Sequence, residues 1–268
     1  MVSWLRANGK FLFRGAALLL AGAAAGFGLG LFFAVPAGPG CQESDLTPVP
    51  DTGFASPAPE AAPASSLPQE EPVSEKWVCL TFDDGPSPQT TARLLNGLRE
   101  RGAHATFFLI GEQIAGSEDL VRRMKDEGHQ VGNHSFTHAR LDAADETALG
   151  EIRKTDEALR AILGEGDYWL RPPWGFSSDA LKAAVSVPMI FWSMDTMDWS
   201  VRNRDLVSYA ITSEAQPGDI ILLHDPYESS VDAALQAIDV LGAQGYEFVT
   251  LEELFSCFGV TPKAGHFY

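Results

Sequence analysis

The regular alternation of short apolar runs with amphipathic helical patterns most constrains how this chain can fold. From Lys76 onward, apolar runs occur at 77–82, 105–110, 129–132, 168–170, 188–194, 219–223 and 246–250. Helical patterns lie between them at 88–101, 113–127, 145–163, 178–185, 204–214 and 230–243, with a last one at 251–258. Strands that alternate with helices pair in parallel, so the pattern predicts an α/β fold.

The number and spacing of these units favour a distorted (β/α)7 barrel. Seven units occupy about 185 residues, whereas a full eightfold barrel usually takes about 250. A doubly wound sheet is the alternative architecture. We place the domain that carries the candidate site at 76–258 and treat 259–268 as a C-terminal tail.

The N-terminal region differs from this domain in composition. Residues 1–14 contain Arg6, Lys10 and Arg14, and residues 15–37 are uncharged and almost wholly apolar. An apolar run of this length can cross a bilayer as a helix, which takes about 20 residues. The basic flank predicts that 1–14 is cytoplasmic, that 15–37 is a membrane anchor and that the rest is extracytoplasmic. A cleaved signal peptide followed by secretion is the alternative, although its apolar core is usually about 7–15 residues.

Residues 38–75 have the composition of a linker. Nine of the 17 prolines lie between Pro36 and Pro72, and residues 38–75 contain seven acidic side chains but no Lys or Arg. Such a segment buries too little apolar surface to fold and is kept extended by proline. The formal net charge of −17 also argues against nucleic-acid binding, which needs a basic face.

Histidine, aspartate or arginine, which can act in catalysis or bind a metal, follows five of the seven apolar runs. They are Asp83 and Asp84, then His134 and His138, Arg171, Asp195 with Asp198, and His224. In a parallel α/β barrel, the carboxyl ends of the strands converge on one face, where sites are built. The sequence therefore predicts one site made from these residues, whereas His104 and His129 lie at strand starts and are expected to be structural.

Each of these residues also has a simpler interpretation. Asp83 and Asp84 could belong to a turn, and Arg171 could be a surface cation. His134 and His138 are spaced i, i+4, which on a helical turn puts both rings on one side, either facing solvent or facing a ligand. Two imidazoles and one carboxylate make a three-ligand set for catalytic zinc. Asp198 and His224 could be helix caps or a carboxylate that tunes an imidazole.

Five motifs in this order carry a resemblance to a known family. TFDDGP, HSFTH, RPPWG, DTMDW and LLH, within roughly residues 76–256, are similar to the motifs of the polysaccharide deacetylases. That family includes chitooligosaccharide, chitin, peptidoglycan N-acetylglucosamine and acetylxylan deacetylases. The resemblance implies that Asp84, His134 and His138 bind one divalent metal, with zinc favoured and cobalt, nickel or manganese as alternatives.

The resemblance also implies roles for the other residues. Asp83 would be the general base, held by Arg171, and His224 would be the general acid, tuned by Asp198. Three further residues would contact the substrate: Trp174 through a backbone N–H for the oxyanion, and Trp199 and Leu222 through a pocket for the acetyl methyl group. Many relatives carry tyrosine where this chain has Trp174.

The function implied is metal-dependent removal of N-acetyl groups from a cell-envelope polysaccharide, with release of acetate. Peptidoglycan N-acetylglucosamine is the favoured substrate, because an anchor and linker suit a substrate in the cell's own envelope. The alternatives are an O-acetyl esterase of the acetylxylan type and a non-catalytic glycan-binding homologue. We expect the polysaccharide and the membrane as partners, and neither nucleic acid nor a protein partner.

Overall fold

The structure is a computed structural model that describes residues 14–15 and 76–268. The predicted linker at 38–75 and, apart from Gly15, the predicted anchor at 15–37 lie outside these residues, as does the basic segment before Arg14. Within residues 14–15 and 76–268, no helix is both long enough and apolar enough to cross a membrane.

The described strands are parallel and form one connected system. The strand order is β1–β5–β6–β2–β3–β4, and β7 pairs with β2. Their bounds are Arg14–Gly15 (β1), Lys76–Gly85 (β2), Thr106–Leu109 (β3), Gln130–Asn133 (β4), Met194–Asp195 (β5), Ile220–His224 (β6) and Tyr246–Phe248 (β7). The predicted α/β fold with a parallel sheet is confirmed.

Isolated bridges extend the pairing beyond β4. Asn133 bridges to Leu170, and Leu170 bridges to Met189. The segment that contains Met189 leads into β5, which pairs with β6, so the pairing returns to the middle of the sheet. This circuit is compatible with the predicted distorted barrel. The expected strands at 168–170 and 188–194 are shorter than predicted, partly because Pro188 has no N–H to donate to a ladder.

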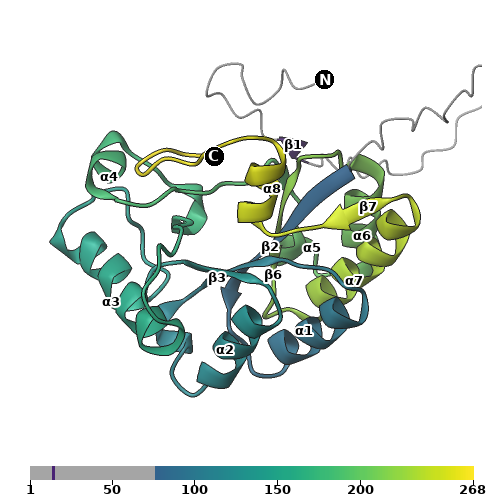
Figure 1. The fold of residues 1–268 in the computed structure, drawn as a ribbon, viewed down its shortest axis with the longest axis horizontal. Coiled ribbons are helices and arrows are strands. Elements are labelled where there is room, and N and C mark those ends of the chain that lie inside the picture. Colours follow the sequence, from purple (N-terminus) through teal and green to yellow (C-terminus); the bar gives the residue numbers. More distant parts are fainter. Residues whose placement is uncertain (1–13, 16–75) are drawn as a thin grey trace, which may run out of the picture. The chain divides into compact units, whose positions relative to one another are not determined.

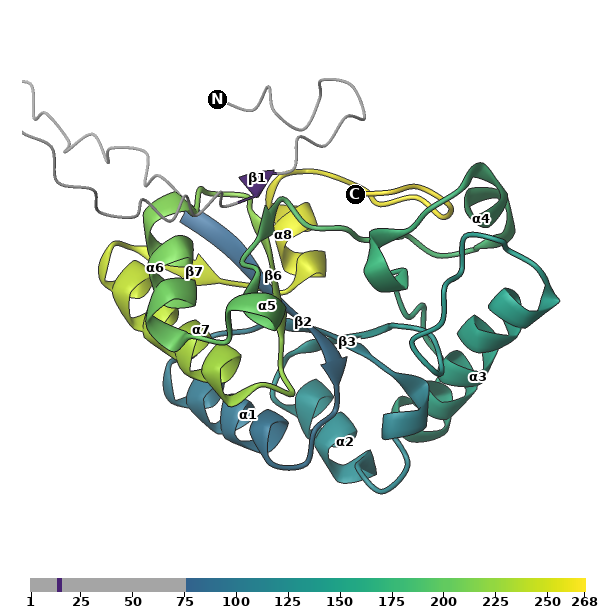
Figure 2. The same ribbon diagram turned by 180° about the vertical axis from the view of Figure 1, so that it is seen from behind.

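Most of the helices lie along one face of the strands, as Figures 1 and 2 show. The α-helices are Thr90–Glu100 (α1), Glu118–Asp126 (α2), Glu146–Leu163 (α3), Asp179–Ala184 (α4), Asp198–Val201 (α5), Arg204–Glu214 (α6), Glu228–Ala243 (α7) and Leu251–Cys257 (α8). Short 3-10 helices span Gly111–Gln113 and Pro173–Gly175. Helices α3, α2, α1, α7 and α6 contact one another in that order. The seven predicted helices are present; α5 was not predicted.

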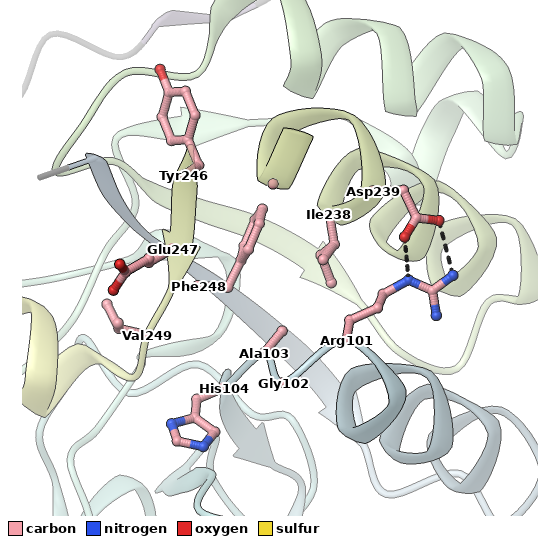
Figure 3. A pocket seen from close by; sticks show the side chains of 11 residues that line it. Arg101, Gly102, Ala103, His104, Ile238, Asp239, Tyr246, Glu247, Phe248 and Val249 are labelled. Atoms are coloured by element: carbon pink, nitrogen blue, oxygen red, sulfur yellow. Dashed lines mark hydrogen bonds and ion pairs between the residues drawn. The ribbon is translucent and has the colours of Figure 1, made fainter. Parts of the chain in front are cut away.

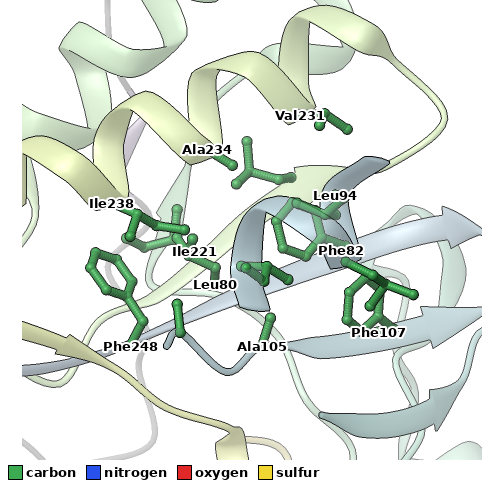
Figure 4. Packing of buried hydrophobic residues seen from close by; sticks show 14 of the residues in the cluster. Leu80, Phe82, Leu94, Ala105, Phe107, Ile221, Val231, Ala234, Ile238 and Phe248 are labelled. Atoms are coloured by element: carbon green, nitrogen blue, oxygen red, sulfur yellow. The ribbon is translucent and has the colours of Figure 1, made fainter. Parts of the chain in front are cut away.

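The side chains of the central strand β2 point alternately into two hydrophobic clusters, one on each face of the sheet. Val78, Leu80 and Phe82 belong to the large cluster under the helices, where Figure 4 shows Leu80 and Phe82 near Leu94 of α1. Cys79 belongs instead to a second cluster on the other face, packed with α8. Because side chains alternate along a strand, Thr81 and Asp83 share the face of Cys79. Asp83 therefore points away from the helix-covered core.

The C-terminal segment packs onto the same domain. Phe267 forms a parallel bridge with Met189, and its ring stacks on Phe191 with a centroid separation of 4.8 Å. The ring of Tyr268 contacts Phe255 of α8. Residues 259–268, set apart as a tail by the sequence pattern, thus add contacts beside the strand segment that follows Pro188.

Candidate active site

A cavity of about 420 Å3 lies where the predicted polar strand ends meet. Eight of the ten predicted site residues line it, namely Asp83, Asp84, His134, His138, Trp174, Trp199, Leu222 and His224. The other two, Arg171 and Asp198, are fully buried and each is bonded to a lining side chain. The structure therefore brings the predicted side chains together around one cavity.

A β-bulge brings the two adjacent carboxylates into the same cavity. In a regular strand, Asp83 and Asp84 would point to opposite faces. The register of β2 against β3 shifts between Asp83 and Gly85, and Asp84 has a left-handed backbone with φ 68°. A bulge of this kind turns one side chain to a new direction. Both carboxylates therefore line the cavity.

Asp84, His134 and His138 form a cluster whose chemistry fits a metal ion. One ligand atom from each lies within 4.8 Å of the others. Asp84 Oδ1 is 3.6 Å from Nε2 of His134 and 3.4 Å from Nε2 of His138. This oxygen is buried without a hydrogen-bond partner. A buried acceptor without a donor, next to two imidazole nitrogens, is typical of a cation site.

The two imidazoles are prepared for this role in different ways. His134 Nδ1 lies 2.7 Å from the carbonyl oxygen of Arg171, so Nδ1–H donates to it and Nε2 faces the cluster. Burial and the neighbouring His134 lower the pKa of His138. A lowered pKa keeps the ring neutral, as a metal ligand must be.

The segment that carries the two histidines is a loop, and the predicted helical turn is absent. Ser135 and His138 both have left-handed backbones, with φ 65° and 59°. The rings nevertheless lie on the same side, with centroids 5.0 Å apart. Glu151 of α3 holds the loop, because one carboxylate oxygen accepts from the N–H groups of Phe136 and Thr137 at 3.1 and 2.6 Å. The spacing predicted two rings on one side, which the structure has, but a loop and not a helical turn places them there.

Replacing Glu151 should loosen the loop that carries the histidines. We expect Glu151→Ala to lower the free energy of unfolding by about 1–3 kcal/mol, because two partly buried N–H groups lose their charged acceptor. Metal affinity should fall by roughly 10–100-fold, as is typical when a group that supports the ligands is lost. Glu151→Gln keeps an acceptor oxygen and should lose less of both. Denaturant unfolding and metal competition titrations measure the two effects, and an unchanged metal affinity in Glu151→Ala would contradict this role.

Arg171 forms a buried ion pair with Asp83. Its Nη1 donates to Asp83 Oδ1 at 2.8 Å and to Thr81 Oγ1 at 2.7 Å. The other guanidinium nitrogens donate to the carbonyl oxygens of Ile190 and Phe191. A buried ion pair is stable only when its remaining donors are also bonded, and these contacts meet that requirement. The arrangement fixes the position of the Asp83 carboxylate.

His224 lies beside Asp83 and is bonded to Asp198. The two residues are directly paired on neighbouring parallel strands, Asp83 on β2 and His224 on β6. His224 Nδ1 is 2.8 Å from Asp198 Oδ1, and its backbone N–H donates to Asp198 Oδ2 at 2.8 Å. Burial alone would lower the pKa of His224. The hydrogen bond and charge of Asp198, with the charges of Asp83 and Asp84, outweigh burial and raise it to about 9.

This pKa predicts a pH dependence that Asp198 controls. His224 is protonated at neutral pH, and activity that needs this proton should fall as the pH rises through the raised pKa. We expect Asp198→Asn to move the alkaline limb of kcat/KM to lower pH by about one unit or more, because a paired charge is removed. Asp195→Asn is the matched control, since Asp195 bonds the N–H of Met197 instead. If the alkaline limb of kcat/KM lay at the same pH in the wild type and in Asp198→Asn, Asp198 would not raise the pKa of the catalytic proton donor.

Aromatic side chains form much of the cavity mouth. The Trp174 side chain is 66% exposed, and its ring lies 4.7 Å from the ring of His138. The Trp174 backbone is left-handed, with φ 63°. Trp199 is 47% exposed, whereas Leu222 is buried in the wall. Exposed tryptophans beside a polar cluster are suited to contact a sugar ring.

A larger cavity, of about 560 Å3, lies beside β7 and the turn before β3. Figure 3 shows Arg101 directed at Asp239 there, and Arg101 donates to its two carboxylate oxygens at 2.7 and 2.9 Å. His104 Nδ1 lies 3.4 Å from Glu253 Oε2. Burial, with a contribution from His104, lowers the pKa of His129 to about 4. The charged groups are already paired, in agreement with the structural role expected for His104 and His129.

Comparison with known proteins decides the family. The polysaccharide deacetylase family model matches residues 70–189. A peptidoglycan-N-acetylglucosamine deacetylase of Bacillus cereus is 35% identical over 192 residues, which cover 69% of this chain and 70% of that protein. This chain belongs to the polysaccharide deacetylase family.

Other family members are named for different substrates. A peptidoglycan-N-acetylmuramic acid deacetylase of Bacillus subtilis is 38% identical over 191 residues, covering 70% of this chain but only 41% of that protein. The chain thus spans about two fifths of that longer relative. A solved family 4 acetyl xylan esterase from Clostridium thermocellum, in complex with a cobalt ion, is 31% identical with a TM-score of 0.68. The match covers 72% of this chain and 98% of that structure.

Several residues of this family site were not predicted from the sequence. Glu151 could have been found as a charged residue on the buried face of α3, where Ala148 and Ile152 are also buried. The sequence pattern gives little indication of Asp225, which is fully buried and accepts a hydrogen bond from the hydroxyl of Thr91. Asp225 also lies against Gly85, where an added Cβ would be 2.5 Å from Asp225 Oδ1. Three others line the cavity from outside the five motifs: Trp192, Arg202 and Tyr227.

Proposed function

We propose that this protein hydrolyses N-acetyl groups from peptidoglycan, at N-acetylglucosamine, and releases acetate with the help of one divalent metal. The observation that carries the proposal is the joint arrangement of three groups in one cavity. They are the Arg171-bound carboxylate of Asp83, the Asp198-bound imidazole of His224, and the Asp84 cluster. The names of the peptidoglycan deacetylase relatives support the substrate class.

The protein side chains supply the proton transfers of amide hydrolysis. Asp83, held by Arg171, accepts the proton of the attacking water. The left-handed backbone at Trp174 lies at the cavity, and its N–H donates to the oxygen that gains negative charge. His224, protonated at neutral pH, gives its proton to the departing sugar amine. Because Asp83 and His224 are paired on adjacent strands, the base and the acid can both reach the same acetamido group.

Asp84, His134 and His138 would hold the metal. When bound, a divalent ion lowers the pKa of water and polarises a carbonyl oxygen. The mixture of two imidazoles and one carboxylate suits zinc, and it also accepts cobalt, nickel or manganese. The cobalt ion bound in the related acetyl xylan esterase structure supports a metal in this family.

An O-acetyl esterase is the second candidate. The similarity to an acetyl xylan esterase at 31% identity favours it, since the same machinery can release an alcohol in place of an amine. The proposed location outside the cytoplasm, based on the apolar run at 15–37 and its basic flank, favours the envelope substrate. Protease treatment of intact, wall-stripped cells tests that location: cleavage of the 76–268 region supports it, and full resistance contradicts it.

The function is tested by acetate release from three substrates with the purified full-length protein. N-acetylglucosamine oligomers, peptidoglycan and acetylxylan are each compared with and without a chelator. Chelator-sensitive acetate from the two N-acetylated glycans is expected. Acetate from acetylxylan alone would favour the esterase, and no acetate with no bound metal would favour a non-catalytic glycan-binding protein.

A further inference from the structure

Arg202 is a cation at the cavity that the deacetylation mechanism does not use. Among the residues at 14–15 and 76–268 that line the cavity, it is the one Lys or Arg. It directly follows α5, the helix that carries Asp198 and Trp199. Arg202 and Met197, which bracket α5, both have left-handed backbones, with φ 47° and 55°. Such backbones are disfavoured for residues with a side chain and cluster at functional sites.

The guanidinium of Arg202 is held by neutral partners. Its Nε donates to the carbonyl oxygen of Trp199 at 2.7 Å, and its central carbon lies 3.1 Å from the centroid of the Tyr227 ring. Within the described part of the chain it forms no ion pair, whereas Arg140 pairs with Asp142 and Arg204 pairs with Asp205. The Arg202 side chain is thus positioned, exposed and not neutralised.

The charges around Arg202 make this position unusual. The carboxylates that line the cavity are Asp83, Asp84 and Asp195, and the whole chain carries a formal net charge of −17. An acidic glycan approaching such a protein is repelled except where a cation offsets the field. A guanidinium can bind a carboxylate through two parallel N–H groups, which fixes its orientation as well as its distance.

We propose that Arg202 binds a carboxylate carried by the glycan next to the acetamido group that is removed. This inference rests on the proposed function and deepens it: the preferred substrates are acidic N-acetylated glycans, and neutral ones bind without this contact. In peptidoglycan, two chemical sources supply such a carboxylate: the stem peptide, and the lactyl group of the muramic acid sugar where its amide bond to the peptide has been cut. Trp199 and Trp174 contact the sugar rings. Arg202 fixes which sugar of the chain lies over the catalytic residues, because it binds the carboxylate of the neighbouring unit.

The test compares three glycans as substrates of the full-length protein. They are neutral N-acetylglucosamine oligomers, peptidoglycan strands with stem peptides, and the same strands after an amidase has removed the peptides. For Arg202→Gln, we expect kcat/KM on one or both acidic glycans to fall about tenfold, mainly through KM. On the neutral oligomers it should stay within about twofold of wild type. The tenfold difference should shrink at high salt, because screening weakens exposed charge pairs. Loss confined to strands that retain peptides identifies the peptide carboxylate, and loss confined to the amidase-treated strands identifies the lactyl carboxylate, which is free only there. Loss on both acidic glycans means that Arg202 accepts either carboxylate.

Arg204→Gln is the matched control, because Arg204 is a nearby exposed arginine already paired with Asp205 and is absent from the cavity lining. It should behave as wild type on all three glycans. An equal loss on neutral and acidic glycans in Arg202→Gln would mean that Arg202 only positions α5, and no loss on any glycan would mean that it binds nothing; either result overturns the inference. Absence of acetate release by the unaltered protein from all three would overturn the proposed function itself.

Discussion

Asp83→Asn should abolish nearly all turnover while the protein still binds its metal. A general base typically contributes about 10²–10⁴-fold to the rate, and asparagine cannot accept the proton. The metal should remain, because the proposed ligands are Asp84, His134 and His138. Steady-state acetate release and metal content, measured on the same preparation, test this prediction. Full activity would remove Asp83 from the role of base.

The buried ion pair complicates this variant in a predictable way. Arg171 is fully buried, so loss of its carboxylate partner should cost about 3–5 kcal/mol of stability. Thr81→Val is the matched control, since it removes another hydrogen bond to the same guanidinium and leaves Asp83 intact. It should lower the Tm but keep turnover within about tenfold of wild type. If Thr81→Val lost as much turnover as Asp83→Asn, the loss would reflect Arg171 and not proton transfer.

Removal of a proposed ligand should have the second large effect. We expect His138→Ala to reduce bound metal from about one ion per chain to nearly none, because two remaining ligands seldom hold a catalytic metal. Acetate release should fall with it. His104→Ala is the control, since His104 belongs to the other cavity and pairs with Glu253. An unchanged metal content in His138→Ala would remove His138 from the ligand set.

Periodicity made most of the fold predictable. The apolar runs placed the ends of β4 and β6 to within about one residue, whereas β2 continues past its run at 77–82 to Gly85; the polar residues at these strand ends do meet in one cavity. Parallel pairing brings the carboxyl ends of these strands to one edge of the sheet, so their general convergence is predictable from the strand order. The pairing of Asp83 with His224 is a consequence of register, which a single sequence does not encode in its apolar pattern.

Features that depend on local backbone geometry were less predictable. Nothing in the pattern of β2 shows that Asp84 bulges, although the bulge is what places both carboxylates on one side. The loop of His134 and His138 depends on Glu151, a residue distant in sequence. The missed contacts are thus tertiary: a carboxylate from one helix satisfies the backbone of a loop that the sequence pattern describes as a helical turn.

The central claim, hydrolysis supported by a metal at the Asp84 cluster, is tested most directly by titrating metal back into the chelated full-length protein. Bound zinc and acetate released from N-acetylglucosamine oligomers are measured at each step. We predict that activity rises in proportion to bound metal and levels off at about one ion per chain. Full activity in the metal-free protein, or activity that does not follow the bound metal, would contradict this claim.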